Sequence, residues 1–190
     1  MLTVPNVLTL LRLFLVPFFL LASFRGMYVT AFSLFVGAAV TDIFDGMIAR
    51  RFNQRSRLGA ILDPAADKTM LVCGYLYYTL ASLPRVQIPG WLTFVVFIRD
   101  FLIAIFAYLL YTRVDVKKFP PSWAGKTSTL LQAITLAAVI AVNAFWPSLL
   151  TFAHVLFHIT LLTTLYSSWD YLRRGERLLY DGVAASEMRA

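Results

Sequence analysis

Long apolar segments separated by short polar stretches dominate the hydrophobic pattern of this 190-residue chain. Each approaches the roughly 20 mostly apolar residues that an α-helix needs to cross a bilayer. There are six, over residues 5–24, 28–49, 59–80, 91–111, 127–145 and 149–171. Glycine and proline mark the short connections between them. The pattern predicts an all-α integral membrane protein with six transmembrane helices in one bundle.

The composition agrees with a membrane location. Hydrophobic residues make up 59% of the chain and the mean hydropathy is +0.73, too apolar for an ordinary soluble domain. The net charge is +7, but the basic residues lie in short runs between apolar segments, as an anionic membrane surface favours. We therefore expect the lipid bilayer as the partner and no nucleic acid.

Lysine and arginine gather at alternate connections. The second connection, the fourth connection and the C-terminal stretch carry Arg50, Arg51, Arg55, Arg57, Arg113, Lys117, Lys118, Lys126, Arg173, Arg174 and Arg177. The odd connections carry only Arg25 and Arg85. Positive charge favours the cytoplasmic side, so both termini are predicted to be cytoplasmic. Residues 1–172 are then one membrane domain, and 173–190 a basic cytoplasmic tail.

Four aspartates lie where the second and third predicted helices approach their connection. Asp42 and Asp45 are followed by Gly46 and Ala49 at helical spacing, and the next helix continues with Gly59, Asp63 and Asp67. Positions three and four apart share one helical face. Because a short connection makes the two helices antiparallel, the two acidic faces can be turned toward each other.

Buried carboxylates need compensation. Each costs roughly 2.5–3.5 kcal/mol inside a span, and the nearby bases Lys68, Arg50 and Arg12 are too few for four of them. Mg²⁺ takes carboxylate oxygens together with substrate phosphate oxygens, and two such ions can clamp a diphosphate. The sequence thus predicts a site for two Mg²⁺ ions, with Mn²⁺ as the alternative metal.

Gly46 and Gly59 leave room between the acidic faces for a nucleotide, although close helix packing explains them equally well. Arg50 can bind phosphate through its guanidinium fork, or serve as an ordinary positive anchor at the cytoplasmic end. His154 and His158 are four residues apart on the last predicted span, but no H-E-x-x-H arrangement accompanies them. We expect no ligand role for these histidines.

The complete string D-x2-D-G-x2-A-R-x8-G-x3-D-x3-D, from Asp42 to Asp67, resembles the signature of the CDP-alcohol phosphatidyltransferases at every fixed position. The opening P-N-V-L-T-L-L-R at 5–12 is similar to the P-N-x-L-T-x-x-R of that family. D-P-A-A-D-K at 63–68 is similar to the D-P-x-A-D-K of its phosphatidylglycerophosphate synthase and cardiolipin synthase branches.

This resemblance implies a role for each motif residue. Metal ligation falls to Asp42, Asp45, Asp63 and Asp67, and Asp67 is also the base that deprotonates the acceptor hydroxyl. The cytidine diphosphate of CDP-diacylglycerol is contacted by Asn6, Thr9, Gly46, Ala49, Arg50 and Gly59. The acceptor attacks the β-phosphorus in line and CMP leaves. The resemblance further implies a polar cavity on the cytoplasmic side, a homodimer and a bacterial inner (cytoplasmic) membrane location.

Two further features of the sequence bear on the identity of the acceptor alcohol. Arg99 and Asp100 lie in the middle of the fourth apolar segment. Neighbouring side chains on a helix point to different sides, so we expect each to find partners on other helices rather than its neighbour. Arg99 then either forms a structural interhelical ion pair or holds an anionic acceptor.

The stretch S-W-A-G-K-T-S-T-L-L-Q at 122–132 resembles the S-W-x-G-K-x-K-T-x-x-Q of phosphatidylglycerophosphate synthases, with Ser128 in place of the second lysine. That loss, and Asp100 in place of Glu, are more similar to eukaryotic-type cardiolipin synthases, whose acceptor is phosphatidylglycerol. Arg99, Lys117, Lys118 and Lys126 are the predicted acceptor contacts, and ordinary cytoplasmic anchoring explains the lysines as well. Glycerol 3-phosphate is the favoured acceptor and phosphatidylglycerol the alternative.

Two rival classes fit part of the pattern. An intramembrane prenyltransferase also places aspartates and Mg²⁺ on a diphosphate, but it does not explain the Ala49-Arg50 pair or G-x3-D-x3-D. A membrane transporter or channel would line a passage open to both faces with its acids. Here all four acids gather at one end of two predicted helices.

Overall fold

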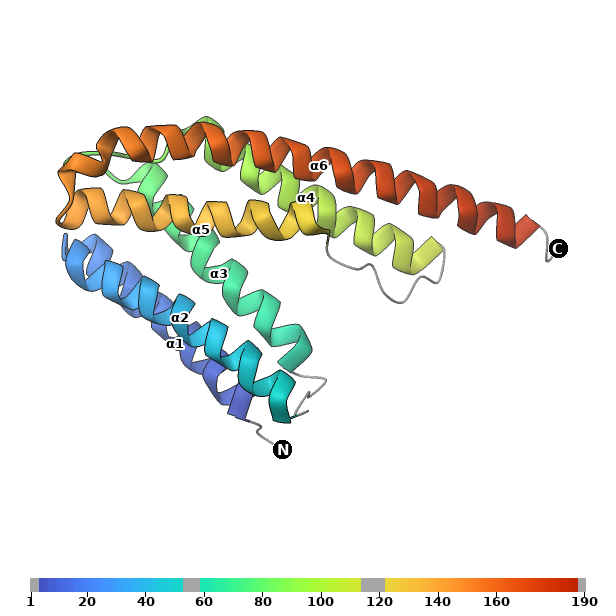
Figure 1. Ribbon diagram of the computed structural model, residues 1–190, viewed down its shortest axis with the longest axis horizontal. Helices are drawn as coiled ribbons and strands as arrows, with labels where there is room; N and C mark the ends of the chain where they lie inside the picture. The colour runs from blue at the N-terminus through green and yellow to red at the C-terminus, as the bar shows by residue number, and fades with distance from the viewer. Residues whose placement is uncertain (1–3, 53–58, 114–121, 188–190) are drawn as a thin grey trace. The chain divides into compact units, whose positions relative to one another are not determined.

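The computed structural model describes the backbone of residues 4–52, 59–113 and 122–187, and the side chains of 10–41, 68–106 and 122–175. Every regular element in these ranges is helical. The order is α1 (Val4–Phe24), α2 (Tyr28–Phe52), α3 (Gly59–Leu80), α4 (Gly90–Arg113), α5 (Trp123–Ala144), the short 3-10 helix η1 (Pro147–Leu149) and α6 (Leu150–Glu187) (Figure 1). The all-α prediction is confirmed for the part of the chain described, and a long helix covers each predicted apolar segment.

The largest difference from the sequence pattern is at the end of α6. The apolar segment ends near residue 171, yet the helix continues to Glu187 and has 38 residues. At 1.5 Å per residue it is about 57 Å long, well beyond the roughly 30 Å hydrocarbon core of a bilayer. The extension is rich in Leu, Arg, Glu and Ala, which favour helix without being apolar overall.

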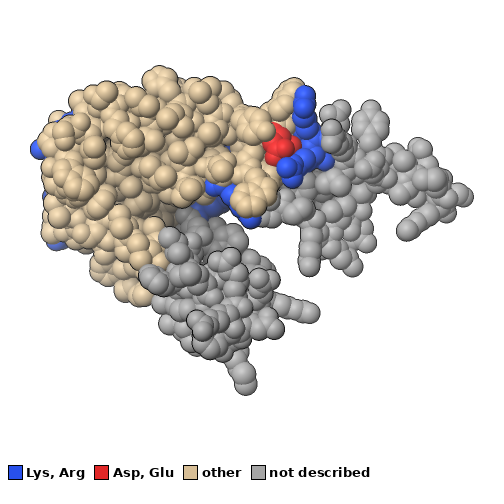
Figure 2. Space-filling view, viewed as in Figure 1, with Lys and Arg blue, Asp and Glu red and all other residues tan. Residues whose placement is uncertain are grey.

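Within the described part of the chain, two helical stretches are long and apolar enough to cross a membrane, Trp123–Ala144 and Pro147–Gly175, and shorter apolar helices cover Leu10–Phe24 and Tyr28–Thr41. Large apolar side chains are also well exposed, among them Phe14, Phe24, Phe94 and Leu162. Figure 2 shows a face on which most of the described surface belongs to uncharged residues. An exposed apolar surface of this kind is typical of a protein in contact with lipid, and it indicates a membrane protein.

The chain divides into two compact units, each made from two stretches. The first contains Met1–Ile88 and Ala133–Ala153, and the second contains Pro89–Gln132 and His154–Ala190. In the first unit α1 packs against both α2 and α3. Its core is aromatic: the fully buried Phe19 ring lies 6.0 Å from that of Phe35 and 6.4 Å from that of Tyr78.

The turn between α1 and α2 fixes the antiparallel pairing of these helices. Gly26 has a φ of 70°, which a side-chain-bearing residue rarely adopts. Its N–H donates to the carbonyl oxygen of Ser23 at 3.0 Å, and the Met27 N–H donates to that of Ala22 at 2.9 Å. These bonds satisfy carbonyl groups that the end of α1 leaves free.

The connection between α3 and α4 closes the end of α5 in the first unit. The Arg85 guanidinium donates from Nη1 to the carbonyl oxygens of Val142, at 2.8 Å, and Asn143, at 3.1 Å. A cation is favourable there because the carbonyl end of a helix carries partial negative charge. Arg85 therefore stabilises the end of α5, a role that the distribution of Lys and Arg over the connections does not reveal.

Candidate active site

The aspartate motif lies on two helices of the first unit. Asp42, Asp45, Gly46, Ala49 and Arg50 belong to the last turns of α2, and Gly59, Asp63 and Asp67 to the first turns of α3. Because both stretches are helical, the spacing of each set keeps its members on one face. The side chains of these residues, like those of Asn6 and Thr9, lie outside the described residues. Their predicted roles therefore stay predictions.

Two basic side chains near the motif are described. Arg12 of α1 is only 3% exposed and interacts with another group of the protein. Lys68, which directly follows Asp67, is exposed and also interacts with another group of the protein. Among the side chains described, no three His, Cys, Asp or Glu residues come close enough to hold a metal ion.

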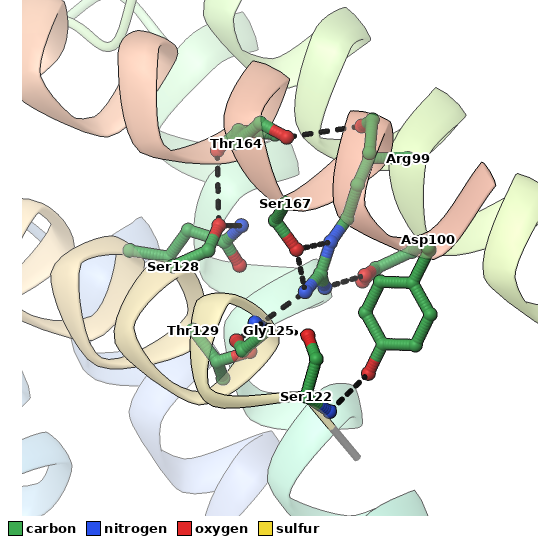
Figure 3. Close-up of polar contacts among 11 residues, drawn as sticks. Arg99, Asp100, Ser122, Gly125, Ser128, Thr129, Thr164 and Ser167 are labelled. Carbon is green, nitrogen blue, oxygen red and sulfur yellow. Dashed lines mark hydrogen bonds and ion pairs between the residues drawn. The ribbon is translucent and has the colours of Figure 1, made fainter. Parts of the chain in front are cut away.

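The second unit contains a buried cation surrounded by polar groups (Figure 3). The guanidinium of Arg99, on α4, is 4% exposed. Its Nε and Nη2 donate to the hydroxyl oxygen of Ser167 at 3.3 and 2.9 Å, and Nη2 also donates to the carbonyl oxygen of Gly125 at 3.3 Å. Ser167 belongs to α6 and Gly125 to α5, so one side chain links three helices.

Arg99 and Asp100 also form an ion pair with each other. From their adjacent positions on the helix we expected each to find its partners on other helices instead. Nη1 of Arg99 lies 2.7 Å from Oδ1 of Asp100. Successive Cβ atoms do diverge on a helix, but the long stem of arginine lets its guanidinium turn back to the adjacent carboxylate. The expectation was wrong for this contact. It was right for Arg99 in one respect, because its other partners come from other helices.

Tyr171 of α6 closes the other side of this cluster. Its hydroxyl accepts a hydrogen bond from the Ser122 N–H at 3.2 Å, and the Arg99 guanidinium carbon lies 5.8 Å from the centre of its ring. The Ser122 hydroxyl in turn accepts from the Gly125 N–H at 2.9 Å, which is the bond of a helix N-cap. A serine just before Trp123 thus begins α5 and fixes its position against α6.

Gly125 is required by close approach. A Cβ at this position would lie 2.8 Å from the Tyr171 hydroxyl oxygen and 3.2 Å from Nη2 of Arg99. The first distance is shorter than real Cβ contacts, so any larger residue would displace the tyrosine or the guanidinium. The glycine of the S-W-x-G-K stretch therefore makes room for Tyr171 and, less tightly, for Arg99.

Ser128 stands where the resembled pattern has its second lysine, and it is completely buried. Its hydroxyl lies 3.2 Å from that of Thr164 on α6, and the Gln132 amide donates to it at 3.3 Å. This position faces the packed interface of α5 and α6. A lysine there would need a different arrangement of these side chains.

A comparison with known sequence families decides what kind of protein this is. Residues 2–166 match the family model described as CDP-alcohol phosphatidyltransferase. The chain belongs to this family. The match covers most of the chain, including the aspartate motif, Arg99 and the S-W-x-G-K stretch. The protein is therefore a phosphatidyltransferase, and the prenyltransferase, transporter and channel readings are set aside.

Curated relatives are similar over nearly the whole chain. A "Probable phosphatidylglycerophosphate synthase" of Mycobacterium tuberculosis is 32% identical over 178 residues, which are 90% of this chain and 81% of the relative. A "CDP-diacylglycerol--glycerol-3-phosphate 3-phosphatidyltransferase" of Escherichia coli K12 is 32% identical over 187 residues, 94% of this chain and 97% of the relative. A Shigella flexneri protein with the same description matches to the same extent.

The two predicted acceptor contacts whose side chains are described differ in exposure. Arg99 is buried, whereas Lys126 is exposed, with its ammonium nitrogen 5.2 Å from the centre of the Trp123 ring. That position suits the alternative in which Lys126 anchors the helix at the membrane surface. Lys117 and Lys118 lie outside the described residues.

The two histidines of α6 do not form a metal site with the described side chains. His154 and His158 are both exposed, and Nδ1 of His158 lies 2.9 Å from the His154 carbonyl oxygen. Their rings pack on aromatic neighbours, that of His158 6.2 Å from Trp91 and that of His154 5.6 Å from Phe157. The expectation of no ligand role for these histidines stays a prediction.

Sequence reasoning missed Ser167 and Tyr171, which contact the Arg99 cluster. The signal was present as a polar stripe in an apolar segment, with Thr160, Thr164, Ser167 and Tyr171 spaced by three or four residues. Thr160, Thr164 and Ser167 are completely buried and Tyr171 is 7% exposed. Such spacing places them on one face of α6, and a search for polar residues at helical spacing would have found them.

Proposed function

We propose that this phosphatidyltransferase transfers the phosphatidyl group of CDP-diacylglycerol to glycerol 3-phosphate and releases CMP. The observation that carries the proposal is the complete aspartate motif on α2 and α3 of a family member whose relatives, described by that reaction, align along nearly the full chain. The reaction makes phosphatidylglycerophosphate, a precursor of an anionic membrane lipid.

Phosphatidylglycerol is the second candidate acceptor, which would make the protein a cardiolipin synthase. Asp100 and Ser128 favour it, because both depart from the phosphatidylglycerophosphate synthase pattern. Ser128 is buried between α5 and α6 and carries no charge, so the cation that the pattern has at this position is missing. The relatives' descriptions support glycerol 3-phosphate, and this support outweighs the two substitutions.

The membrane arrangement is part of the same proposal. Six helices cross a bacterial inner membrane in one bundle formed by residues 1–172, with both termini and a polar, active-site cavity on the cytoplasmic side. The apolar helices and the alternation of lysine and arginine support it. The C-terminal residues 173–190 form a basic tail at that surface. A homodimer is expected from the family resemblance.

The donor set of the motif fits two Mg²⁺ ions, with Mn²⁺ as the alternative. Asp42, Asp45, Asp63 and Asp67 provide only carboxylate oxygens, which are hard ligands that suit Mg²⁺, and each helix presents its pair on one face. When bound, the metal neutralises diphosphate charge and polarises the phosphorus under attack. Without a cation, four carboxylates at adjoining helix ends would repel one another.

The remaining steps belong to the chain's own side chains. Asp67 accepts the proton of the acceptor hydroxyl, because a free alcohol is a weak nucleophile and a nearby carboxylate can take the proton as attack proceeds. Gly46 and Gly59 leave space for the cytidine diphosphate, which Ala49, Arg50, Asn6 and Thr9 also contact. The oxygen then attacks the β-phosphorus in line with the departing CMP.

Arg99 binds the anionic acceptor in this scheme, with Lys117, Lys118 and Lys126 as further basic contacts. A cation held inside the helices is expensive to bury, which supports a use beyond packing. Its guanidinium is fixed by bonds from α5 and α6. A preorganised arginine binds phosphate more strongly than a mobile one, since less freedom is lost on binding.

CMP release from purified protein tests the proposal. CDP-diacylglycerol is supplied with glycerol 3-phosphate, phosphatidylglycerol or no acceptor, in separate reactions with Mg²⁺. We expect rapid CMP release and a phosphatidylglycerophosphate product with glycerol 3-phosphate alone. Product formed only with phosphatidylglycerol would replace the favoured acceptor by the second candidate. If neither glycerol 3-phosphate nor phosphatidylglycerol causes CMP release, both candidate reactions are refuted.

A further inference from the structure

The Arg99 guanidinium donates to other helices from one side and to its own helix from the other. A guanidinium has five N–H donors, and Arg99 directs those of Nε and Nη2 at Ser167 and Gly125. Both acceptors belong to other helices. Nη1 alone contacts Asp100, the adjacent residue on α4. Figure 3 shows these partners around the same planar group.

Burial separates the two sides further. Ser167 has no exposed surface, whereas Asp100 is 20% exposed. The Ser167 side therefore has no path for a ligand, and the Gly125 side is closed by the backbone of α5. Gly125 gives no extra room, because even a methyl group there would lie 3.2 Å from Nη2. Among these acceptors, Asp100 on the Nη1 side is the one with exposed surface.

Ser167 also determines where Nη1 points. Its one hydroxyl oxygen accepts from both Nε and Nη2, at 3.3 and 2.9 Å, and two bonds to one acceptor fix the plane of the guanidinium. Without them only the bonds to Gly125 and Asp100 would hold the group, so the direction of its N–H donors would be less fixed while its charge remained. Phosphate recognition by arginine depends on that direction.

We propose that Ser167 is a positioning residue for the acceptor: it holds the Nε–Nη2 side of Arg99 so that Nη1 is presented to the acceptor's phosphate. This inference rests on the proposed function, in which Arg99 binds an anionic acceptor. A phosphate oxygen can take the place of the Asp100 carboxylate, because both are anionic acceptors for the same donor. Asp100, being partly exposed, can turn to water when it is displaced.

The chain offers a matched control one residue away. Ser168 has the same hydroxyl on the same helix, but it donates to the Thr164 carbonyl oxygen at 2.9 Å within α6. Ser167→Ala removes the two bonds to Arg99, whereas Ser168→Ala removes only a bond internal to the helix. Ser167→Thr keeps the hydroxyl and serves as the conservative rescue variant.

The test is steady-state kinetics of the full chain in detergent micelles, with each substrate varied in turn and the thermal unfolding midpoint recorded. We expect Ser167→Ala to raise the KM for glycerol 3-phosphate about tenfold, since a hydrogen bond to a charged group is lost. Its kcat and its KM for CDP-diacylglycerol should change by less than about twofold. Ser168→Ala should leave all three within that range, and Ser167→Thr should recover much of the loss.

An unchanged KM for glycerol 3-phosphate in Ser167→Ala would overturn the inference, as would a parallel rise for both substrates. If Ser167→Ala does not fold, Gly125→Ala provides the second variant, because its Cβ would lie 2.8 Å from the Tyr171 hydroxyl oxygen and 3.2 Å from Nη2 of Arg99 and so would disturb the packing around the guanidinium. The same KM pattern is required. Failure of the proposed function looks different: the unaltered protein would use only phosphatidylglycerol. The variants are then compared with that acceptor, whose phosphodiester is also anionic, and the same criterion applies.

Discussion

Asn143 pairs with both backbone groups of Val86. Its amide nitrogen donates to the Val86 carbonyl oxygen at 2.9 Å, and its carbonyl oxygen accepts from the Val86 N–H at 3.4 Å. The side chain is 4% exposed and also donates to the Val139 carbonyl oxygen at 2.8 Å. One amide therefore ties the connection between α3 and α4 to the end of α5.

Replacing this amide should destabilise the protein. Asn143→Ala leaves the buried N–H and carbonyl group of Val86 without that partner, and an unsatisfied buried group costs about 1–3 kcal/mol. We expect the free energy of unfolding to fall by about 2 kcal/mol, measured by denaturant titration in detergent. Gln87→Ala is the control, because its amide is exposed and donates to the Ala81 carbonyl oxygen at 2.7 Å. Equal midpoints for the two variants would contradict the role of Asn143.

Two glycines, on α2 and α3, should respond differently when a methyl group is added. A Cβ on Gly74 of α3 would lie 2.5 Å from Cδ2 of Leu136, which is completely buried, whereas one on Gly37 of α2 would meet nothing within 4 Å. Overpacking costs about 1–3 kcal/mol, while alanine favours a helix over glycine by up to about 1 kcal/mol. Thermal unfolding should therefore give a lower midpoint for Gly74→Ala and an equal or higher one for Gly37→Ala. A higher midpoint for Gly74→Ala would show that this contact is loose.

The helices could be predicted because each apolar run ends at glycine, proline or charge. The end of α6 could not be located in the same way, because hydropathy falls after Tyr171 while helix propensity continues through residues such as Leu178 and Ala185. Hydropathy locates the membrane-spanning part of a helix. It does not locate the end of a helix that continues beyond the membrane.

The candidate site shows a similar division. The aspartate motif could be recognised from the sequence because acidic residues inside apolar segments are rare. The family match confirms the class of enzyme that this motif indicated. The Arg99–Asp100 contact was mispredicted because face arguments follow Cβ directions and ignore the reach of a long side chain. Ser167 was missed because a hydroxyl in an apolar helix usually bonds within its own helix, as Ser168 does.

Two tryptophan–cation pairs are expected at one membrane depth. Trp123 and Trp169 are 79% and 55% exposed, and they lie 5.2 Å from the Lys126 ammonium and 4.7 Å from the Arg173 guanidinium. The Ser122–Tyr171 hydrogen bond holds their helices in register. In single-tryptophan variants, lipids labelled near the headgroup should quench both indoles more than lipids labelled at the chain ends, since indole rings favour the interface. Strong quenching from the bilayer centre would contradict this placement.

Removing the proposed base should stop the reaction without unfolding the protein. Asp67→Asn keeps the size of the side chain but cannot accept a proton, and general bases contribute about 10²–10⁴-fold to rate. We expect CMP release to fall at least about a hundredfold, with an unchanged thermal midpoint. Asp170→Asn is the control, because that carboxylate pairs with Arg174 at 3.0 Å on α6. Full activity in Asp67→Asn would refute its assignment.

The dependence of CMP release on a divalent ion tests the two-metal carboxylate site most directly. Purified protein is stripped with EDTA, supplied with CDP-diacylglycerol and glycerol 3-phosphate, and assayed before and after Mg²⁺ is restored. The proposed role of Asp42, Asp45, Asp63 and Asp67 predicts no CMP release in EDTA and full recovery with Mg²⁺. Undiminished CMP release from the stripped protein would contradict it.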